Sequence, residues 1–205
     1  MPESTPPVEM RQRILQQATR LFAQRGYQGT SLQAVADAVG IRKPSLLYWF
    51  RSKDLLRAQV VESLLAHWKK EIPRLMLGAR SGHDRFASTV TALVAYFASD
   101  ENRARLMLRE VLDRPDATRA LMAEHLQPFG TLVTDYIRMG QESGRVRPEV
   151  DPESYVVMVV TMVLGTVAMG GVAASMFDGE QTDRADPLIA ELVRIARESL
   201  FLPRP

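Results

Sequence analysis

Apolar residues recur at helical spacing along most of the 205-residue chain, and this repeat constrains the fold more than any other feature. Residues three and four positions apart share one face of a helix, whereas a half-buried strand needs strict alternation of apolar and polar residues. No segment shows a convincing alternation. The sequence therefore predicts an all-α protein of about nine helices, whose 46% of apolar residues can supply a core although the chain has no cysteine.

Glycine, proline and capping residues divide the first part of this pattern into short helices. We expect the first helix to end at Gly26, because glycine readily adopts the left-handed conformation that closes a helix. A second helix is expected to begin at Thr30, whose hydroxyl would cap the backbone while Gln33 reaches back to it. Gly40 would end that helix, and Pro44 suits the first turn of a third helix because its missing N–H would be unpaired there anyway.

The remaining pattern predicts longer helices. Ser52 is expected to cap a fourth helix that ends near Ile72, because Pro73 interrupts the helical hydrogen bonds. The first ten residues hold three prolines and no apolar run, so residues 1–10 are expected to form a disordered arm rather than a signal peptide. Five further helices are predicted over residues 83–98, 101–112, 117–142, 152–177 and 184–201.

Residues 26–56 read GYQGTSLQAVADAVGIRKPSLLYWFRSKDLL and predict a helix-turn-helix. Ala36 is small where the second and third helices cross, and Gly40 supplies the unusual backbone angle of the turn. Ile41 and Leu46 would fill the space between the helices. Three short helices with a tight middle turn make this segment a candidate DNA-binding unit.

Charge and aromatic residues favour the same function. Residues 1–55 carry eight arginines and lysines against four acids, a net charge of +4, whereas the whole chain has only +2. Such asymmetry is typical of a segment that binds a polyanion. For each cation the alternative is an ordinary solvated charge, and for Trp49 it is packing against the fourth helix. The third helix would present five side chains on or beside its outer face: Arg42, Lys43, Ser45, Tyr48 and Trp49.

The same stretch resembles the signature of the TetR family of transcriptional regulators, a pattern close to GYxGTSLxxIAxxAGVSKGTLYHYFxSKExL. The resemblance implies an N-terminal helix-turn-helix domain over residues 11–55, followed by a larger helical ligand-binding and dimerisation domain over residues 56–205. The matching residues are Gly26, Tyr27, Gly29, Thr30, Ser31, Leu32, Ala36, Gly40, Lys43, Leu46, Phe50, Ser52, Lys53 and Leu55.

The resemblance also implies the contacts with double-stranded DNA. Ser31 and Gln33 would reach phosphates from the start of the second helix. Trp49 would reach a phosphate through its indole N–H, and Lys53 would do so at a helix start. Base edges or the thymine methyl group would be read in the major groove by Lys43, Pro44, Ser45 and Tyr48.

Two positions depart from the family pattern. Leu47 stands where a tyrosine is common, so one usual phosphate contact is missing. Arg42 stands where a small capping residue is usual, and it could add a contact to a base or a phosphate. The operator of this protein therefore cannot be inferred from the family pattern.

The stretch from Tyr155 to Phe177 contains no charged residue and is long enough for a membrane span. It also contains several glycines and hydroxyl residues and has no basic flank, so a helix buried on all sides of a soluble protein is the other interpretation. The core of one subunit could supply that burial. The family resemblance instead implies a homodimer in which the last two helices pair with their copies, through Gly165, Ala168, Ala173, Leu188, Leu192, Ile195 and Leu200.

The resemblance further implies a small-molecule effector that binds inside the larger domain, moves the fourth helix and releases DNA. Aromatic and methionine side chains suit an apolar effector, although each could equally be plain core. We expect a ligand-responsive repressor that binds a near-palindromic operator as a dimer; an activator and a binding module without inducer are the alternatives. The candidate ligand-binding residues are Trp68, Phe86, Tyr96, Phe97, Met107, Glu110, His125, Phe129, Met158 and Met162.

An enzyme is the main competing class of function. His67, His83 and His125 lie far apart in the sequence and in no metal-ligand spacing, and no glycine-rich phosphate loop follows a strand. Without cysteine, disulfides and thiolate catalysis are excluded. We therefore expect no catalytic activity, no cofactor and no metal, and a cytoplasmic protein without a membrane span.

Overall fold

The computed structural model describes residues 7–78, 82–173 and 185–202, and within these residues the chain forms nine α-helices. The all-α prediction is confirmed. In chain order the helices are α1 (Pro7–Arg25), α2 (Leu32–Val39), α3 (Lys43–Trp49), α4 (Lys53–Gly78), α5 (Gly82–Ala98), α6 (Glu101–Asp113), α7 (Pro115–Glu142), α8 (Pro152–Ala173) and α9 (Ala185–Leu200).

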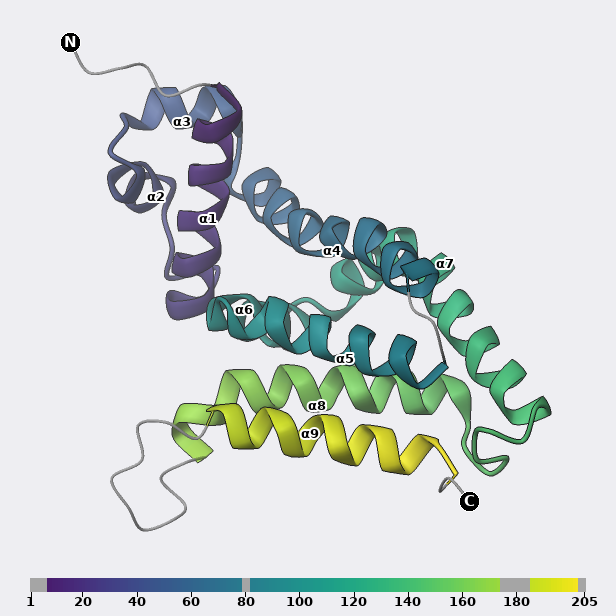
Figure 1. Cartoon of the computed structure of the whole chain (residues 1–205). Coiled ribbons are helices and arrows are strands. Elements are labelled where there is room, and N and C mark those ends of the chain that lie inside the picture. The colour runs from purple at the N-terminus through teal and green to yellow at the C-terminus, as the bar shows by residue number, and fades with distance from the viewer. Residues whose placement is uncertain (1–6, 79–81, 174–184, 203–205) are drawn as a thin grey trace.

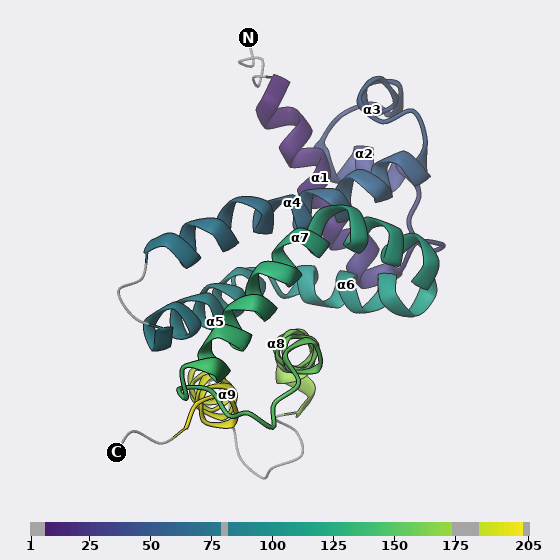
Figure 2. The same ribbon diagram turned by 90° about the vertical axis from the view of Figure 1, so that its right-hand side faces the viewer.

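Helices α1 to α3 form a compact unit at one end of the molecule, which we call the head (Figure 1). Helix α4 leaves the head and packs against α7 in the larger helical domain. Helices α8 and α9 lie side by side at the end opposite to α3, as Figures 1 and 2 both show.

The head has a small core to which all three helices contribute. Ile14, Ala18 and Phe22 of α1 are spaced four residues apart, so they lie on one face, and all three are fully buried. Val35 of α2 and Leu46 of α3 complete this core and are likewise inaccessible. Burial of these side chains holds α3 against α1 and α2 and leaves its other face free.

The start of α2 differs from the prediction by one residue. Ser31, not Thr30, is the N-cap, because its side chain accepts a hydrogen bond from the backbone N–H of Ala34. The buried Thr30 hydroxyl instead donates to the carbonyl oxygens of Leu21 and Gly26, at 3.1 and 2.9 Å. Thr30 therefore ties the start of α2 to the end of α1, where unpaired carbonyl groups need donors.

Two helices extend beyond their predicted limits. Helix α4 passes through Pro73, which was expected to end it near Ile72. Ile72 packs against the core of the larger domain, and this tertiary contact outweighs the lost hydrogen bond. Helix α1 begins at Pro7, inside the segment 1–10 expected to be a disordered arm, because proline is well suited to a first turn. Residues 1–6 lie outside the described residues.

Helix α6 joins the head to the larger domain. The Arg109 side chain donates through Nε to the carbonyl oxygen of Ala23 in α1, at 2.9 Å. The next residue, Glu110, forms a buried ion pair with Arg57 of α4. Because breaking a buried ion pair leaves a charge without a partner, this contact holds α4 and α6 in one relative position.

Candidate functional site

The outer face of α3 is exposed on the head. Leu46 and Phe50 point into the core, whereas Lys43 and Ser45 are exposed and Tyr48 is 82% exposed. An aromatic side chain left in water gains nothing for folding, so its position favours contact with a partner. Gly40 has φ +81° and closes α2 as predicted, and this sets the angle at which α3 leaves the turn.

Arg42, Pro44 and Trp49 complete the candidate base-reading and phosphate-binding set on α3. Arg42 precedes the helix and makes no side-chain capping bond, and both Arg42 and Pro44 are exposed. Trp49 is half-buried against the core, with its ring edge-on to Tyr48 at 5.6 Å between centroids. The packing interpretation of Trp49 therefore describes part of its side chain, and the remainder is accessible.

Lys53 lies at the start of α4, beside a small polar cluster. Its Nζ is 4.1 Å from the centroid of the Tyr27 ring, and the guanidinium of Arg114 is also 4.1 Å from that centroid. The Tyr27 hydroxyl donates to Asp54 at 2.7 Å. Burial, followed by this hydrogen bond to a carboxylate, raises the pKa of Tyr27. The neutral phenol thus holds the ring in place beneath the two cations.

Ser31 and Gln33 are exposed at the start of α2. Ser31 already accepts the capping hydrogen bond of α2. Gln33 does not reach back to the helix start as predicted, because its Nε2 donates to Asp37 one turn further on, at 2.7 Å. The nine predicted DNA-contacting residues belong to α2, α3, the residues that flank them and the start of α4, and Figure 1 shows α2 and α3 at one end of the molecule.

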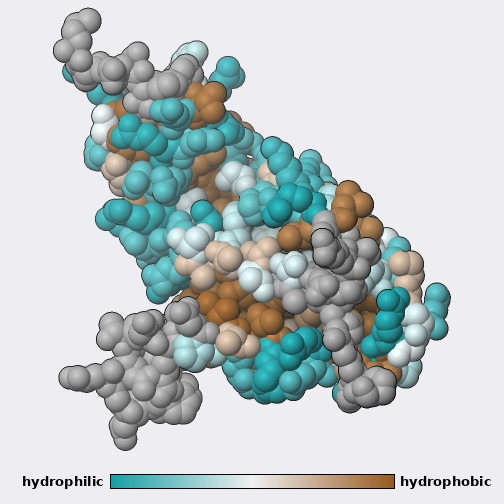
Figure 3. Space-filling model, in the orientation of Figure 1, coloured by the Kyte–Doolittle hydropathy of each residue, from teal (hydrophilic) through white to brown (hydrophobic). Residues whose placement is uncertain are grey.

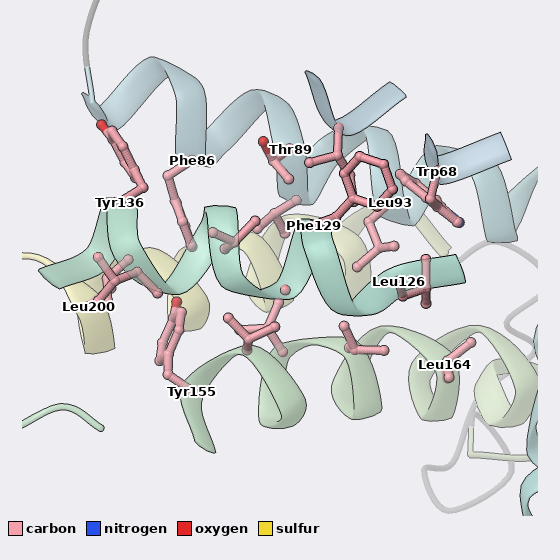
Figure 4. Close-up of a pocket in the computed structure, with 18 of the residues that line it drawn as sticks. Trp68, Phe86, Thr89, Leu93, Leu126, Phe129, Tyr136, Tyr155, Leu164 and Leu200 are labelled. Atoms are coloured by element: carbon pink, nitrogen blue, oxygen red, sulfur yellow. The ribbon is translucent and has the colours of Figure 1, made fainter. Parts of the chain in front are cut away.

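The larger domain contains an apolar cavity of about 230 Å³ (Figure 4). Its walls come from α4, α5, α7 and α8, with Met107 from α6 and Leu200 from α9. Five of the ten predicted ligand-binding residues line it: Trp68, Phe86, Phe97, Met107 and Phe129.

The other five predicted residues lie outside the cavity wall. Glu110 is held by Arg57, and His125 is buried on α7 but does not line the cavity. Tyr96 stacks on His67 with 4.1 Å between ring centroids, on another side of α4. Two methionines on α8 also fall outside: the half-buried Met162 packs against the core, and Met158 is 62% exposed.

Burial affects two polar side chains near the cavity. Desolvation raises the pKa of Tyr155, whose hydroxyl lies in the cavity wall and donates to the carbonyl oxygen of Ala196. Desolvation lowers the pKa of His67, and the nearby Arg103 acts in the same direction. Both groups are therefore favoured in their neutral forms, and Tyr155 has already used its hydrogen atom within the protein.

Several cavity residues were not predicted from the sequence. They include the α7 stripe, spaced by three and four residues, and two tyrosines. This spacing identifies a buried helix face but does not reveal that the face borders a void rather than another side chain. The residues concerned are Met122, Leu126, Gly130, Val133, Tyr136, Ile137 and Tyr155.

Helices α8 and α9 present an apolar face to the outside. Figure 3 shows apolar surface over α8, and the exposed side chains there include Val157, Met169 and Val172. Within the described residues, α8 is the helix long and apolar enough to cross a membrane, over Pro152–Gly170, and only 17% of that stretch is buried. The interpretation that one subunit buries this helix by itself is therefore wrong. Residues 174–177 lie outside the described residues.

The predicted dimer residues divide into two groups. Gly165, Ala168 and Ala173 are half-buried on α8, and two α9 residues are exposed on the same end of the molecule. Leu192 and Leu200 were wrongly assigned to the interface, because both are buried within the subunit, and Leu200 also lines the cavity. The exposed α9 residues are Leu188 and Ile195.

Comparisons with known proteins match both parts of the chain. The model of the bacterial regulatory proteins of the tetR family matches residues 14–60, and that of the tetracyclin repressor-like C-terminal domain matches residues 79–168. The HTH-type transcriptional repressor AcnR of Corynebacterium diphtheriae is 24% identical over 200 residues, which cover 92% of this chain and 94% of that protein.

Solved structures share the fold over almost the whole chain. A regulatory protein of the tetR family from Rhodococcus RHA1 has a TM-score of 0.76 at 19% identity, covering 96% of this chain and 99% of that one. The fatty acid degradation regulator FadR from Bacillus halodurans has a TM-score of 0.74 at 16% identity, covering 96% and 97%. At these identities the likeness concerns the fold alone.

The head with its exposed α3 and the matching family models define a DNA-binding transcriptional regulator. The larger domain, with its internal cavity, is the second half of the same architecture. The chain belongs to the TetR family of bacterial regulatory proteins, a family of transcriptional regulators.

Proposed function

We propose that this protein is a dimeric repressor that binds a near-palindromic operator through α3 of each subunit and is released when an apolar molecule enters the cavity. The observation that carries this proposal is the exposed face of α3. Lys43, Ser45 and Tyr48 are exposed there, whereas Leu46 of the same helix is fully buried in the core of the head. The repressor AcnR is a relative over nearly the full length, which supports repression rather than activation.

The residues of this surface would make two kinds of contact with DNA. Lys43, with Ser45 and Tyr48, would read base edges, and Pro44 would contact a thymine methyl group. Arg42 would reach a base or a phosphate, because its side chain has no capping role. The phosphate contacts that set the register would come from Ser31, Gln33, Trp49 and Lys53.

The apolar face of α8 and α9 supports the homodimer. A two-fold axis through this face would pair the helices with their copies, because the same patch then meets itself. The two α3 helices would enter successive major grooves about 34–36 Å apart. In this arrangement residues 11–55 form the DNA-binding domain and residues 56–205 the ligand-binding and dimerisation domain. Such a regulator acts in the cytoplasm, where its operator is, and dimerisation covers α8 without a membrane.

Helices α4 and α6 would carry the release signal. Trp68 of α4 and Met107 of α6 line the cavity, and the Arg57–Glu110 pair joins these helices nearer to the head. Arg109 extends this path to α1. A ligand that moves these walls would change the separation of the heads, and the affinities for DNA and ligand would be reciprocally linked.

Selection of random duplexes by the purified dimer tests the DNA-binding part of the proposal. We expect one inverted repeat to be enriched, with affinity falling steeply as salt rises because several phosphates are neutralised. Enrichment of no motif, with no binding even at low salt, would overturn the proposal. The position of the recovered operator relative to its promoter then distinguishes a repressor from an activator.

A further inference from the structure

We propose that the cavity takes an elongated, uncharged, hydrocarbon-rich molecule, and that Gly130 keeps the middle of the cavity open to it. This inference rests on the proposed effector role of the cavity and adds the chemical class of the effector. It depends on three observations: the length of the cavity wall, the absence of charged residues from its described lining, and a glycine with no packing role.

The cavity is long because its lining follows the axis of α7. The α7 residues in the wall run from Met122 to Ile137, a distance of about 22 Å at 1.5 Å per residue. Figure 4 shows Trp68 and Leu126 toward one end and Tyr136 and Leu200 toward the other. A volume of about 230 Å³ that extends along such a length forms an elongated channel. The channel therefore suits a chain-like molecule better than a compact one.

The described part of the lining offers no partner for a charged group. Among the lining residues whose side chains the structure describes, none is Asp, Glu, Lys, Arg or His. The buried Arg57 and Glu110 side chains, near Met107 in the structure of α4 and α6, pair with each other. The Tyr155 hydroxyl donates to a backbone carbonyl. Thr89 and Tyr136 also interact within the protein. A carboxylate or ammonium group buried here would lose its hydration without compensation, so the channel selects against both.

Gly130 lies in the centre of the α7 stripe that faces the channel. Leu126, Val133 and Ile137 precede and follow it at spacings of three and four residues, and all of them line the cavity. A Cβ atom added at Gly130 would meet no atom within 4 Å. By contrast, a Cβ at Gly140 would lie 2.5 Å from the Val146 side chain.

The two glycines of α7 therefore have different roles. Gly140 permits close packing, whereas Gly130 borders empty space although glycine weakens a helix interior. A side chain at residue 130 would project into the channel halfway along its length. Because residue 130 has no side chain, the channel is continuous and can hold one long molecule. A side chain at this position would divide the channel into two short compartments.

A series of ligands with one chain and three head groups tests the charge of the effector. Decan-1-ol, decanoate and decyltrimethylammonium, each below its aggregation concentration, are titrated calorimetrically into the full-length dimer. We expect decan-1-ol to bind at least about tenfold more tightly than either ion, because only the ions must lose their hydration unpaired. Equal or tighter binding of decanoate or of the cation would overturn the uncharged class.

Substitution at Gly130 tests the length of the channel. Gly130→Leu should bind tetradecan-1-ol at least about tenfold more weakly and leave hexan-1-ol within about twofold of the original affinity, because one half of the channel remains free. Ala120→Leu is the matched control, since Ala120 is exposed on the same helix outside the lining. Unchanged binding of tetradecan-1-ol by the Gly130→Leu protein would contradict the role of this residue.

Gly130→Ala provides a second measurement should the leucine variant fail to fold. Its methyl group should weaken the binding of tetradecan-1-ol more than that of hexan-1-ol. The variant should also have a higher melting temperature, because alanine favours a helix. An equal effect on both alcohols would overturn the proposal. If no alcohol binds to a dimer that still selects its inverted repeat, the inference and the apolar effector fail together, whereas operator recognition stands. Loss of the inverted repeat would instead overturn the DNA-binding proposal.

Discussion

The head and the larger domain use the same apolar residue types to different ends. In the head, an apolar residue on a helical stripe is core: Leu46 and Phe22 are almost wholly inaccessible. In the larger domain, Val163 of α8 is fully buried, whereas Met158 on the same helix is 62% exposed. Apolar stripes in the larger domain form the core, the cavity wall and an outer face. In the head the burial of a residue therefore follows from the sequence, whereas in the larger domain it also depends on the cavity and on the proposed dimer.

A charge introduced on the outer apolar face of α8 has the largest expected effect, which is on dimerisation. Met158→Glu places a carboxylate in the proposed dimer interface twice, once in each subunit, and should weaken dimerisation by about 4–6 kcal/mol because both charges lose hydration. Sedimentation velocity measures the dissociation, and Ala120→Glu on the exposed side of α7 is the control. A Met158→Glu protein that remains as dimeric as this control would mean that another surface forms the dimer.

The contact that joins the two regions is the next test. Glu110→Ala leaves the buried Arg57 guanidinium without its partner and should cost about 3–5 kcal/mol in free energy of unfolding. Chemical denaturation at a fixed protein concentration measures this loss. Replacing both residues, as Arg57→Met with Glu110→Leu, should recover most of it, because no charge remains buried. If the double variant is as unstable as the single one, side-chain packing rather than charge holds this contact.

A leucine-to-alanine substitution in each region compares how tightly the head and the cavity wall are packed. Leu46→Ala should cost about 3 kcal/mol, because the head has no space to collapse into. Leu126→Ala should cost about 1 kcal/mol, since that half-buried side chain already borders a void and loses fewer contacts. Urea unfolding of both variants gives the difference. Equal costs would show that the cavity wall is packed as tightly as the head.

The smallest effect expected concerns recognition rather than folding. Lys43→Ala should weaken operator binding by about 1–3 kcal/mol and relax the preference at one position in each half-site. Fluorescence anisotropy with the operator and with single-base variants measures both quantities. Lys70→Ala, an exposed cation far along α4, is the control. A uniform weakening across all sequences would assign Lys43 to a phosphate instead of a base.

The sequence predicted the fold well where local chemistry decides the backbone. Gly40 and Pro44 set the ends of α2 and α3 as expected, because each residue has a strong conformational preference. The predicted N-cap of α2 was wrong, because two neighbouring residues could cap this helix equally well. Thr30 and Ser31 both suit an N-cap, and the hydrogen bonds of the Thr30 hydroxyl to the carbonyl oxygens of Leu21 and Gly26 at the end of α1 decide between them.

The cavity could be predicted only in part. Trp68 and Phe129 were identified as lining residues by their size and type, and they line it. Met158 has the same character but faces outward, because the rotation of α8 depends on how it packs against α5, α6, α7 and α9. Gly130 carries no signal in the sequence at all, since a missing side chain matters only once its surroundings are known.

The closeness of Met107, Arg109 and Glu110 on α6 has a practical consequence for building biosensors. These three residues of one helical turn touch the cavity, α1 and α4 respectively. A designer could rebuild the walls on α5 and α7 for a new analyte and leave this turn intact. The reporter gene would then respond to a different compound, while the contacts that connect the cavity wall with α1 and α4 would be unchanged.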